Sequence, residues 1–193
     1  MTARAKPARR LTVREISAEL AEVARAGSIF VDGELVKEAY MPYARGFTCG
    51  DDMDFNPVTT VPLKKTLMRL ERFSRVPCAT TIWRRRPDDP RSGEALLCGF
   101  NSPPQAGGKP ANRGYKFPPM SRELAEVFLR GRQCVVKVDR RAGHTVLTMR
   151  TRGRTVAAKG LKGSALVQVY APVKDSLGEV VGVLEVFAAA IGS

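Results

Sequence analysis

GSALVQVYAPVKDSLGEVVGVLEVFAAA, from Gly163 to Ala190, is the stretch of sequence that decides the fold. Residues 164–173 alternate β-branched and aromatic side chains, and residues 180–188 are again mostly apolar. Between them, residues 174–179 contain Asp, Ser and Gly, which favour turns. The pattern predicts two strands joined by a tight connection, a β-hairpin.

Each predicted strand has one apolar face and one face with a polar group in the middle. Gln168 lies between Leu166 and Tyr170 on the mixed face of the first strand, and Glu185 interrupts an apolar face of the second. We therefore expect one side of the sheet to pack against helices and the other to meet a pocket, a partner or water.

The run VYAPVKDSLGEVVGVLEV (169–186) resembles the closing hairpin of Cache sensor domains, a branch of the PAS-like folds. In that hairpin a Y-x-P-V strand end passes through a D-x-x-G turn into V-V-G-V-L-x-V. GAF domains end in a similar hairpin and are the second family that it resembles. The resemblance implies an α/β fold: a PAS-like (Cache-type) five-stranded antiparallel sheet flanked by helices, with an N-terminal helix.

The chain divides into three predicted segments. Residues 1–10 form a basic, disordered tail, residues 11–58 an N-terminal helix with an irregular segment, and residues 59–193 the Cache/PAS-like sensor domain. Thr12 and Glu15 fit a capping box, which predicts a helix that ends at Gly27. Asp32 and Gly33 predict the turn of a short hairpin over residues 28–36.

The sensor segment is predicted to alternate helices and strand pairs. Apolar spacing indicates a helix over residues 62–76 with Pro62 in its first turn, and Ser121 is expected to cap a helix that reaches Arg130. Residues 79–85 and 95–100 are expected to pair, as are residues 133–138 and 145–150. The long segment 102–119 between them indicates a functional loop or lid.

Positive charge is concentrated in the middle of the chain. The net charge is +13, and residues 59–154 hold 21 basic and 7 acidic side chains. Such a block attracts nucleic acid, anionic lipid or an acidic small ligand. Arginine at ordinary solvent-facing positions explains the same composition without any partner.

Residue types with catalytic or metal-binding chemistry are sparse. His144, the only histidine, falls in a predicted turn, and no G-x-S-x-G nucleophile motif occurs. Asp51, Asp52 and Asp54 cluster without the register of a calcium loop. We expect no enzyme activity, no metal site and no cofactor.

Cysteine spacing and hydropathy indicate the cellular compartment in which the protein is expected. The four cysteines are widely spaced and form no C-x-x-C pair, which favours buried, reduced thiols. The sequence contains no signal-peptide core and no apolar run of about 18 residues. We expect a cytoplasmic protein without membrane insertion.

The resemblance to Cache domains also implies a ligand site on the sheet under the long loop. Placed by that resemblance, Arg113 and Tyr115 would bind a carboxylate, because a guanidinium binds both oxygens and a phenol adds a donor. Trp83, Gln168 and Tyr170 would supply its floor and wall. The alternatives are a solvated Arg113, a Tyr115 that packs the loop down, and a Tyr170 that belongs to the core.

The sequence thus predicts a stand-alone, non-catalytic sensory module for a small, anionic carboxylate ligand. Its signal would pass through a separate signalling protein or through a homodimer that uses the N-terminal helix. A protein-interaction scaffold without a ligand is one alternative. A basic nucleic-acid-binding protein is the other, although strand alternation separates Trp83 from Arg84 and Arg86.

Overall fold

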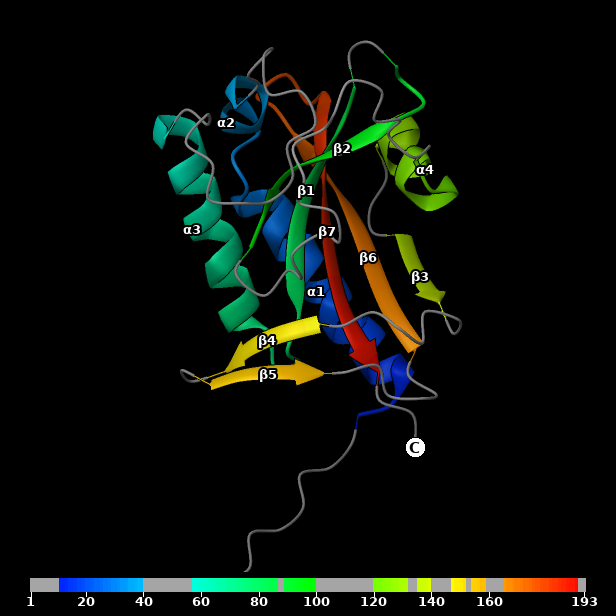
Figure 1. Cartoon of the computed structure of the whole chain (residues 1–193). Helices are drawn as coiled ribbons and strands as arrows, with labels where there is room; N and C mark the ends of the chain where they lie inside the picture. Colours follow the sequence, from blue (N-terminus) through cyan, green and yellow to red (C-terminus); the bar gives the residue numbers. More distant parts are fainter. Residues whose placement is uncertain are drawn as a thin grey trace, which may run out of the picture.

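The computed structural model describes residues 11–39, 57–86, 89–99, 120–131, 135–139, 147–151, 154–158 and 165–190. In this part of the chain, helices and an antiparallel sheet form a mixed α/β fold (Figure 1). The predicted α/β class, with an antiparallel sheet flanked by helices and an N-terminal helix, is confirmed. The predicted segments 1–10 and 102–119 lie outside the described residues.

The predicted hairpin lies inside the main sheet. It consists of β6 (Ala165–Lys174) and β7 (Val180–Ala190), and β7 is the central strand of the order β2-β1-β7-β6-β3. All neighbouring strands are antiparallel. The remaining strands of this sheet are β1 (Ala79–Arg85), β2 (Gly93–Cys98) and β3 (Val135–Asp139).

The predicted pairing of residues 133–138 with residues 145–150 is wrong. β3 pairs with β6, where Val138 lies opposite Val167, while β4 (Leu147–Thr151) pairs with β5 (Arg154–Ala158) as a separate ribbon. A long apolar strand such as β6 would otherwise present an open edge of unpaired backbone groups, and β3 covers that edge. Covering the edge of β6 therefore decides the pairing of β3 more strongly than the closeness of β3 and β4 in the sequence does.

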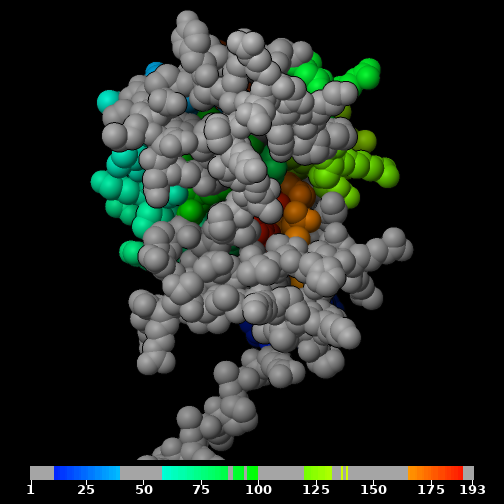
Figure 2. Space-filling model, in the orientation of Figure 1, coloured from blue at the N-terminus to red at the C-terminus, as the bar shows by residue number. Residues whose placement is uncertain are grey.

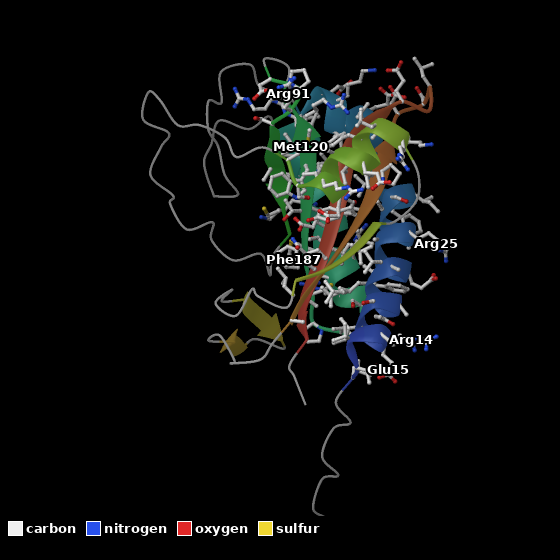
Figure 3. All side chains as sticks on the ribbon, turned by 90° about the vertical axis from the view of Figure 1, so that its right-hand side faces the viewer. Arg14, Glu15, Arg25, Arg91, Met120 and Phe187 are labelled. Carbon is white, nitrogen blue, oxygen red and sulfur yellow. The ribbon has the colours of Figure 1, made fainter. Side chains whose placement is uncertain are left out.

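Helices α1 (Val13–Phe30) and α3 (Pro57–Phe73) cover the apolar face of the sheet. The side chains that are fully buried there are Val167, Val169, Val173, Leu184 and Val186 of the hairpin and Leu20, Val23, Leu63 and Leu67 of the two helices. Figure 3 shows Arg14 and Arg25 of α1 on one side of the sheet and Met120 and Phe187 on the other. The opposite, mixed face is covered at one end by α4 (Arg122–Arg130) (Figure 1).

The start of α1 is as predicted, and its end is not. Thr12 accepts a hydrogen bond from the Glu15 amide at 3.2 Å, and its own amide donates to Glu15 Oε2 at 2.8 Å. The helix passes through Gly27 and continues to Phe30. Gly27 is buried where α1 crosses β7, and a side chain there would collide with Leu184. Glycine here allows α1 to pack closely against Leu184 and Leu70 and does not stop the helix.

The predicted hairpin over residues 28–36 is also wrong, because α2 (Gly33–Glu38) replaces it. The Asp32 carboxylate accepts from the amides of Glu34 at 2.9 Å and Leu35 at 3.3 Å, so Asp32 is an N-cap. Gly33 lies against the backbone carbonyl of Lys174, where a β-carbon would not fit. The Asp-Gly pair therefore starts a helix at a crowded position instead of turning a hairpin.

Helix α2 docks on the turn between β6 and β7. Lys37 Nζ lies 3.0 Å from Asp175 Oδ2, and the Ser176 amide donates to Glu34 Oε1 at 2.9 Å. The hydrogen bond from Lys37 lowers the pKa of Asp175 below its usual range. Gly178 closes the turn with φ of 83°, a left-handed conformation that glycine adopts without steric cost.

Helix α3 begins earlier than predicted. Pro57, not Pro62, stands at its start, and Pro62 lies inside the helix. Near its end, the buried Glu71 accepts from the Thr80 amide at 3.0 Å and the Thr80 hydroxyl at 2.9 Å, which attaches α3 to β1. The N-cap predicted at Ser121 of α4 is confirmed by a 3.2 Å hydrogen bond from the Leu124 amide.

We expect Gly33→Ala to destabilise the protein by about 3 kcal/mol, because overpacking against a backbone carbonyl forces α2 away from the hairpin turn. For a chain of this size that corresponds to a melting temperature lower by roughly 6–12 °C in a thermal denaturation experiment. Gly178→Ala is the comparison: its β-carbon would have no neighbour within 4 Å, so only the left-handed φ is unfavourable, by about 1–2 kcal/mol. Equal melting temperatures for the two variants would contradict this explanation.

Candidate functional site

A buried carboxylate, that of Glu185, lies on the mixed face of the sheet. Glu185 is only 5% exposed. Trp83 Nε1 donates to its Oε2 at 2.6 Å, and Gln168 Nε2 donates to its Oε1 at 2.7 Å. The three side chains come from β1, β6 and β7, so the carboxylate joins three adjacent strands.

The strand register explains why these side chains meet. Glu185 lies directly opposite Thr81 of β1 and Tyr170 of β6. Trp83 is two residues after Thr81 and Gln168 is two residues before Tyr170, so both side chains are on the same face as Glu185. Such diagonal neighbours are about 7–8 Å apart at the backbone, within reach of long side chains.

Tyr170 is the fourth member of this group, which we call the Glu185 cluster: Trp83, Gln168, Tyr170 and Glu185. Burial raises the pKa of the Tyr170 phenol far above its usual range, and the charge of Glu185 raises it further. The phenol therefore stays protonated at neutral pH. Hydrogen bonding with the Ser121 side chain acts in the opposite direction and connects Tyr170 to the start of α4.

Helix α4 packs over one end of the cluster. Its buried side chains Leu124, Val127 and Phe128 contact Tyr170 and Val183. Met120, just before the helix, and the ring of Trp83 are partly buried in the same group. The polar atoms of the cluster thus lie beside an apolar wall, where water is partly excluded and hydrogen bonds are stronger than in bulk solvent.

The structure brings together three of the five predicted ligand-binding residues: Trp83, Gln168 and Tyr170. Arg113 and Tyr115 lie outside the described residues, and a ligand-binding role for all five stays a prediction. Sequence reasoning did not name Glu185 as a site residue. The available signal was a single acidic residue inside the apolar run VVGVLEVF, where a charge is unexpected unless the fold gives it partners.

Other reactive groups are few in the described part of the chain. It contains no group of three His, Cys, Asp or Glu side chains placed to hold a metal ion, while Asp51, Asp52, Asp54 and His144 lie outside it. Burial raises the pKa of the Cys78 thiol to about 12, so this cysteine is not a thiolate at neutral pH.

Cys98 does not fit the expected set of four reduced thiols, because it is disulfide-bonded. Disulfides are uncommon in reducing compartments. Among the described helices, none combines the length and the apolar character needed to cross a membrane.

Figure 2 shows atoms of β6 and β7, in orange and red, near the centre of the face that carries the cluster. They lie between α3, in cyan, and α4, in yellow-green. The mixed face of the hairpin is therefore the face seen from this side, with helices at its two margins.

Comparison with known proteins gives only distant similarity, and only among solved structures. No protein-family model and no curated protein matches the chain. Among solved structures, it is similar to a GAF domain of A. aeolicus nlh2 in an inactive state, with 17% sequence identity and a TM-score of 0.35. The match covers 90% of this chain and 81% of that chain. A TM-score at this level carries no argument about function, and the Cache resemblance of the hairpin stays a prediction.

We expect Trp83→Phe and Glu185→Leu to be energetically coupled, because each removes one partner of the same 2.6 Å hydrogen bond. A hydrogen bond to a charged group contributes about 1.5–3 kcal/mol. Trp83→Phe should therefore destabilise the wild-type protein by that much more than it destabilises the Glu185→Leu variant. Chemical denaturation of the two single variants and the double variant measures the difference. Additive effects would mean that the hydrogen bond does not contribute to stability.

Proposed function

We propose that the protein is a non-catalytic sensory module that binds a small molecule over the mixed face of its central sheet. The observation that supports this proposal is the buried Glu185 carboxylate at the centre of that face. The other face of the same hairpin is packed with valine, leucine and alanine. One face of the hairpin therefore forms the hydrophobic core, and we assign ligand binding to the other.

A purely structural role is a weaker explanation of the Glu185 cluster. Burying a carboxylate costs several kcal/mol, and replacing buried ionic groups by apolar side chains of similar volume is often neutral or stabilising. An apolar residue at position 185 would continue the packing of its neighbours Val183 and Phe187 on that face. A few polar groups held on an otherwise apolar surface are typical of a recognition site, where they orient the ligand.

The chemistry of the cluster restricts the ligand. A group that approaches Glu185 must donate hydrogen bonds, as an amine, an amide or a hydroxyl does. A ligand carboxylate beside Glu185 would be repelled by a like charge. The ligand carboxylate that the sequence predicts, with Arg113 and Tyr115 as its binding residues, would therefore have to lie away from Glu185, and the donor group of the ligand would bind Glu185.

We expect small molecules that carry both a donor group and a carboxylate, such as amino acids, to raise the melting temperature. A ligand at a hundred times its Kd stabilises the folded state by about 2.7 kcal/mol. In a chain of this size that corresponds to roughly 5–11 °C. Thermal-shift screening against amino acids, amines and dicarboxylates measures the effect. Glu185→Gln should remove the shift caused by amine-bearing compounds, and Arg113→Ala the shift that requires a carboxylate.

Glu126→Gln is the matched control, because it makes the same chemical change on the outer side of α4, where Glu126 pairs with Arg130 at 3.0 Å. It should leave every ligand-induced shift unchanged. If no compound of the panel stabilises the wild type, or if Glu185→Gln retains the full shift, the proposal is wrong. The scaffold alternative would then be preferred.

Output through a homodimer is part of the same proposal. At the end of α1, Ile29 and Phe30 are 73% and 70% exposed, and Phe73 of α3 is 70% exposed. Phe30 and Phe73 line an apolar groove of about 430 Å³ between the two helices. Because α1 also packs on the back of β6 and β7, a dimer contact at this end could respond to changes in the sheet. A separate signalling protein is the other proposed partner.

We expect Phe30→Ser to shift the protein toward the monomer in sedimentation equilibrium, because it removes an aromatic side chain from the contact. Leu177→Ser is the control, since Leu177 is 80% exposed at the hairpin turn, away from that groove. A wild-type protein that stays monomeric at all concentrations, or equal dissociation of both variants, would exclude a dimer through this end of α1.

A further inference from the structure

A second cavity, a groove of about 680 Å³, lies at the end of the sheet where β1 ends and β7 begins. Residues of α2, the end of α4 and both sides of the hairpin turn complete its walls. Figure 1 shows α2, the β6–β7 turn and α4 gathered at the same end of the molecule. We call it the basic groove because of the side chains that line it: Lys37, Arg84, Arg85, Arg130 and Lys174.

The basic groove has an excess of positive charge. Among its lining residues Glu179 is the one carboxylate. Lys37 is paired with Asp175, and Arg130 with Glu126, each at 3.0 Å. These two carboxylates offset part of the positive charge of the groove. An occupant with two to four negative charges would neutralise the positive charge that remains.

Two of the cations have no carboxylate partner within the described part of the chain: Arg85 and Lys174. The guanidinium carbon of Arg85 lies 5.3 Å from the centre of the Phe128 ring, a cation–π contact that fixes its position. Its Nε atom is buried without a hydrogen-bond acceptor. A buried guanidinium atom without an acceptor is unfavourable, and an anion in the groove would supply the missing counter-charge.

The basic groove also presents apolar surface. Val36 and Phe128 are buried in its walls, while Leu129 is 76% exposed at its side. An occupant with an organic body would cover this surface while its anionic groups meet the arginines. Guanidinium groups bind phosphate and carboxylate oxygens in the same forked geometry.

The size of the basic groove favours a small molecule over a protein segment. Its volume is within the range of about 300–1,000 Å³ that ligand pockets have. Thirteen residues line it, fewer than the roughly 20–30 residues that each side of a stable protein interface contributes. We propose that the basic groove binds a small organic anion that carries at least two negative charges on phosphate or carboxylate groups.

This site is distinct from the Glu185 cluster. Val181, at the edge of the basic groove, is four residues from Glu185 on β7, roughly 13 Å along a strand. The Glu185 carboxylate repels anions, whereas the groove attracts them. The proposal therefore does not depend on ligand binding at the sheet face.

Isothermal titration with two probes tests the proposal: adenosine triphosphate as an organic phosphate and citrate as an organic carboxylate. We expect at least one of them to bind the wild-type protein. Lys174→Gln and Arg85→Gln should each weaken that binding about tenfold, because each removes a charged hydrogen-bond donor. Glu179→Gln should strengthen it, because it removes the one lining carboxylate. The probe that binds more tightly shows whether phosphate or carboxylate is preferred.

Lys65→Gln is the matched control, since it removes one positive charge from an exposed position on α3 outside the basic groove. It should change the affinity less than twofold, as should Glu185→Gln. Thermal denaturation confirms that each variant is folded. Absence of binding by both probes, or equal weakening by Lys65→Gln and Lys174→Gln, would overturn the proposal. Tighter binding of a single-stranded oligonucleotide, weakened equally by all lysine variants, would overturn it in favour of a nucleic-acid surface.

Discussion

The buried Glu185 carboxylate is the constraint on which the centre of the structure depends. A carboxylate removed from water needs hydrogen-bond donors, and those donors come from the strands on both sides of β7. Trp83 and Gln168 reach it only if β1 and β6 pair with β7 in the observed register. A shift by two residues would keep the apolar side chains on their own face of the sheet, but it would move the donors away from Glu185. The polar cluster therefore selects one register among several that apolar packing alone would allow.

The β6–β7 hairpin borders three different chemical environments. Toward α1 and α3 it presents a close-packed apolar surface, and at Gly27 a β-carbon on α1 would displace the side chains of Leu184 and Leu70. Toward α4 it presents the Glu185 cluster, and at its turn the basic groove begins. A single hairpin can serve all three because alternate residues of a strand face opposite sides and its turn extends beyond the sheet.

Helix α4 connects the two proposed sites. Phe128 packs with Tyr170 in the apolar wall beside the cluster, and its ring also lies under the Arg85 guanidinium in the basic groove. A change in the position of α4 at one site would therefore change the walls of the other. Helix α2 has a similar role at the turn, where Lys37 and Glu34 hold Asp175 and Ser176 while Val36 and Lys37 line the groove.

The amino-acid sequence alone determined the features that depend on neighbouring residues. Strand alternation predicted β6, β7 and β1. Hydrogen-bonding side chains at Thr12, Glu15 and Ser121 predicted where two helices begin. Both signals depend only on residues that are close together in the chain. The polar positions Gln168 and Glu185 were visible for the same reason. Tertiary structure alone decided that Asp32 caps a helix, that Gly27 lies inside one, and that β3 pairs with β6. It also decided that Glu185 meets Trp83 and that five cations share one groove, because contacts between distant segments depend on how complete elements pack together.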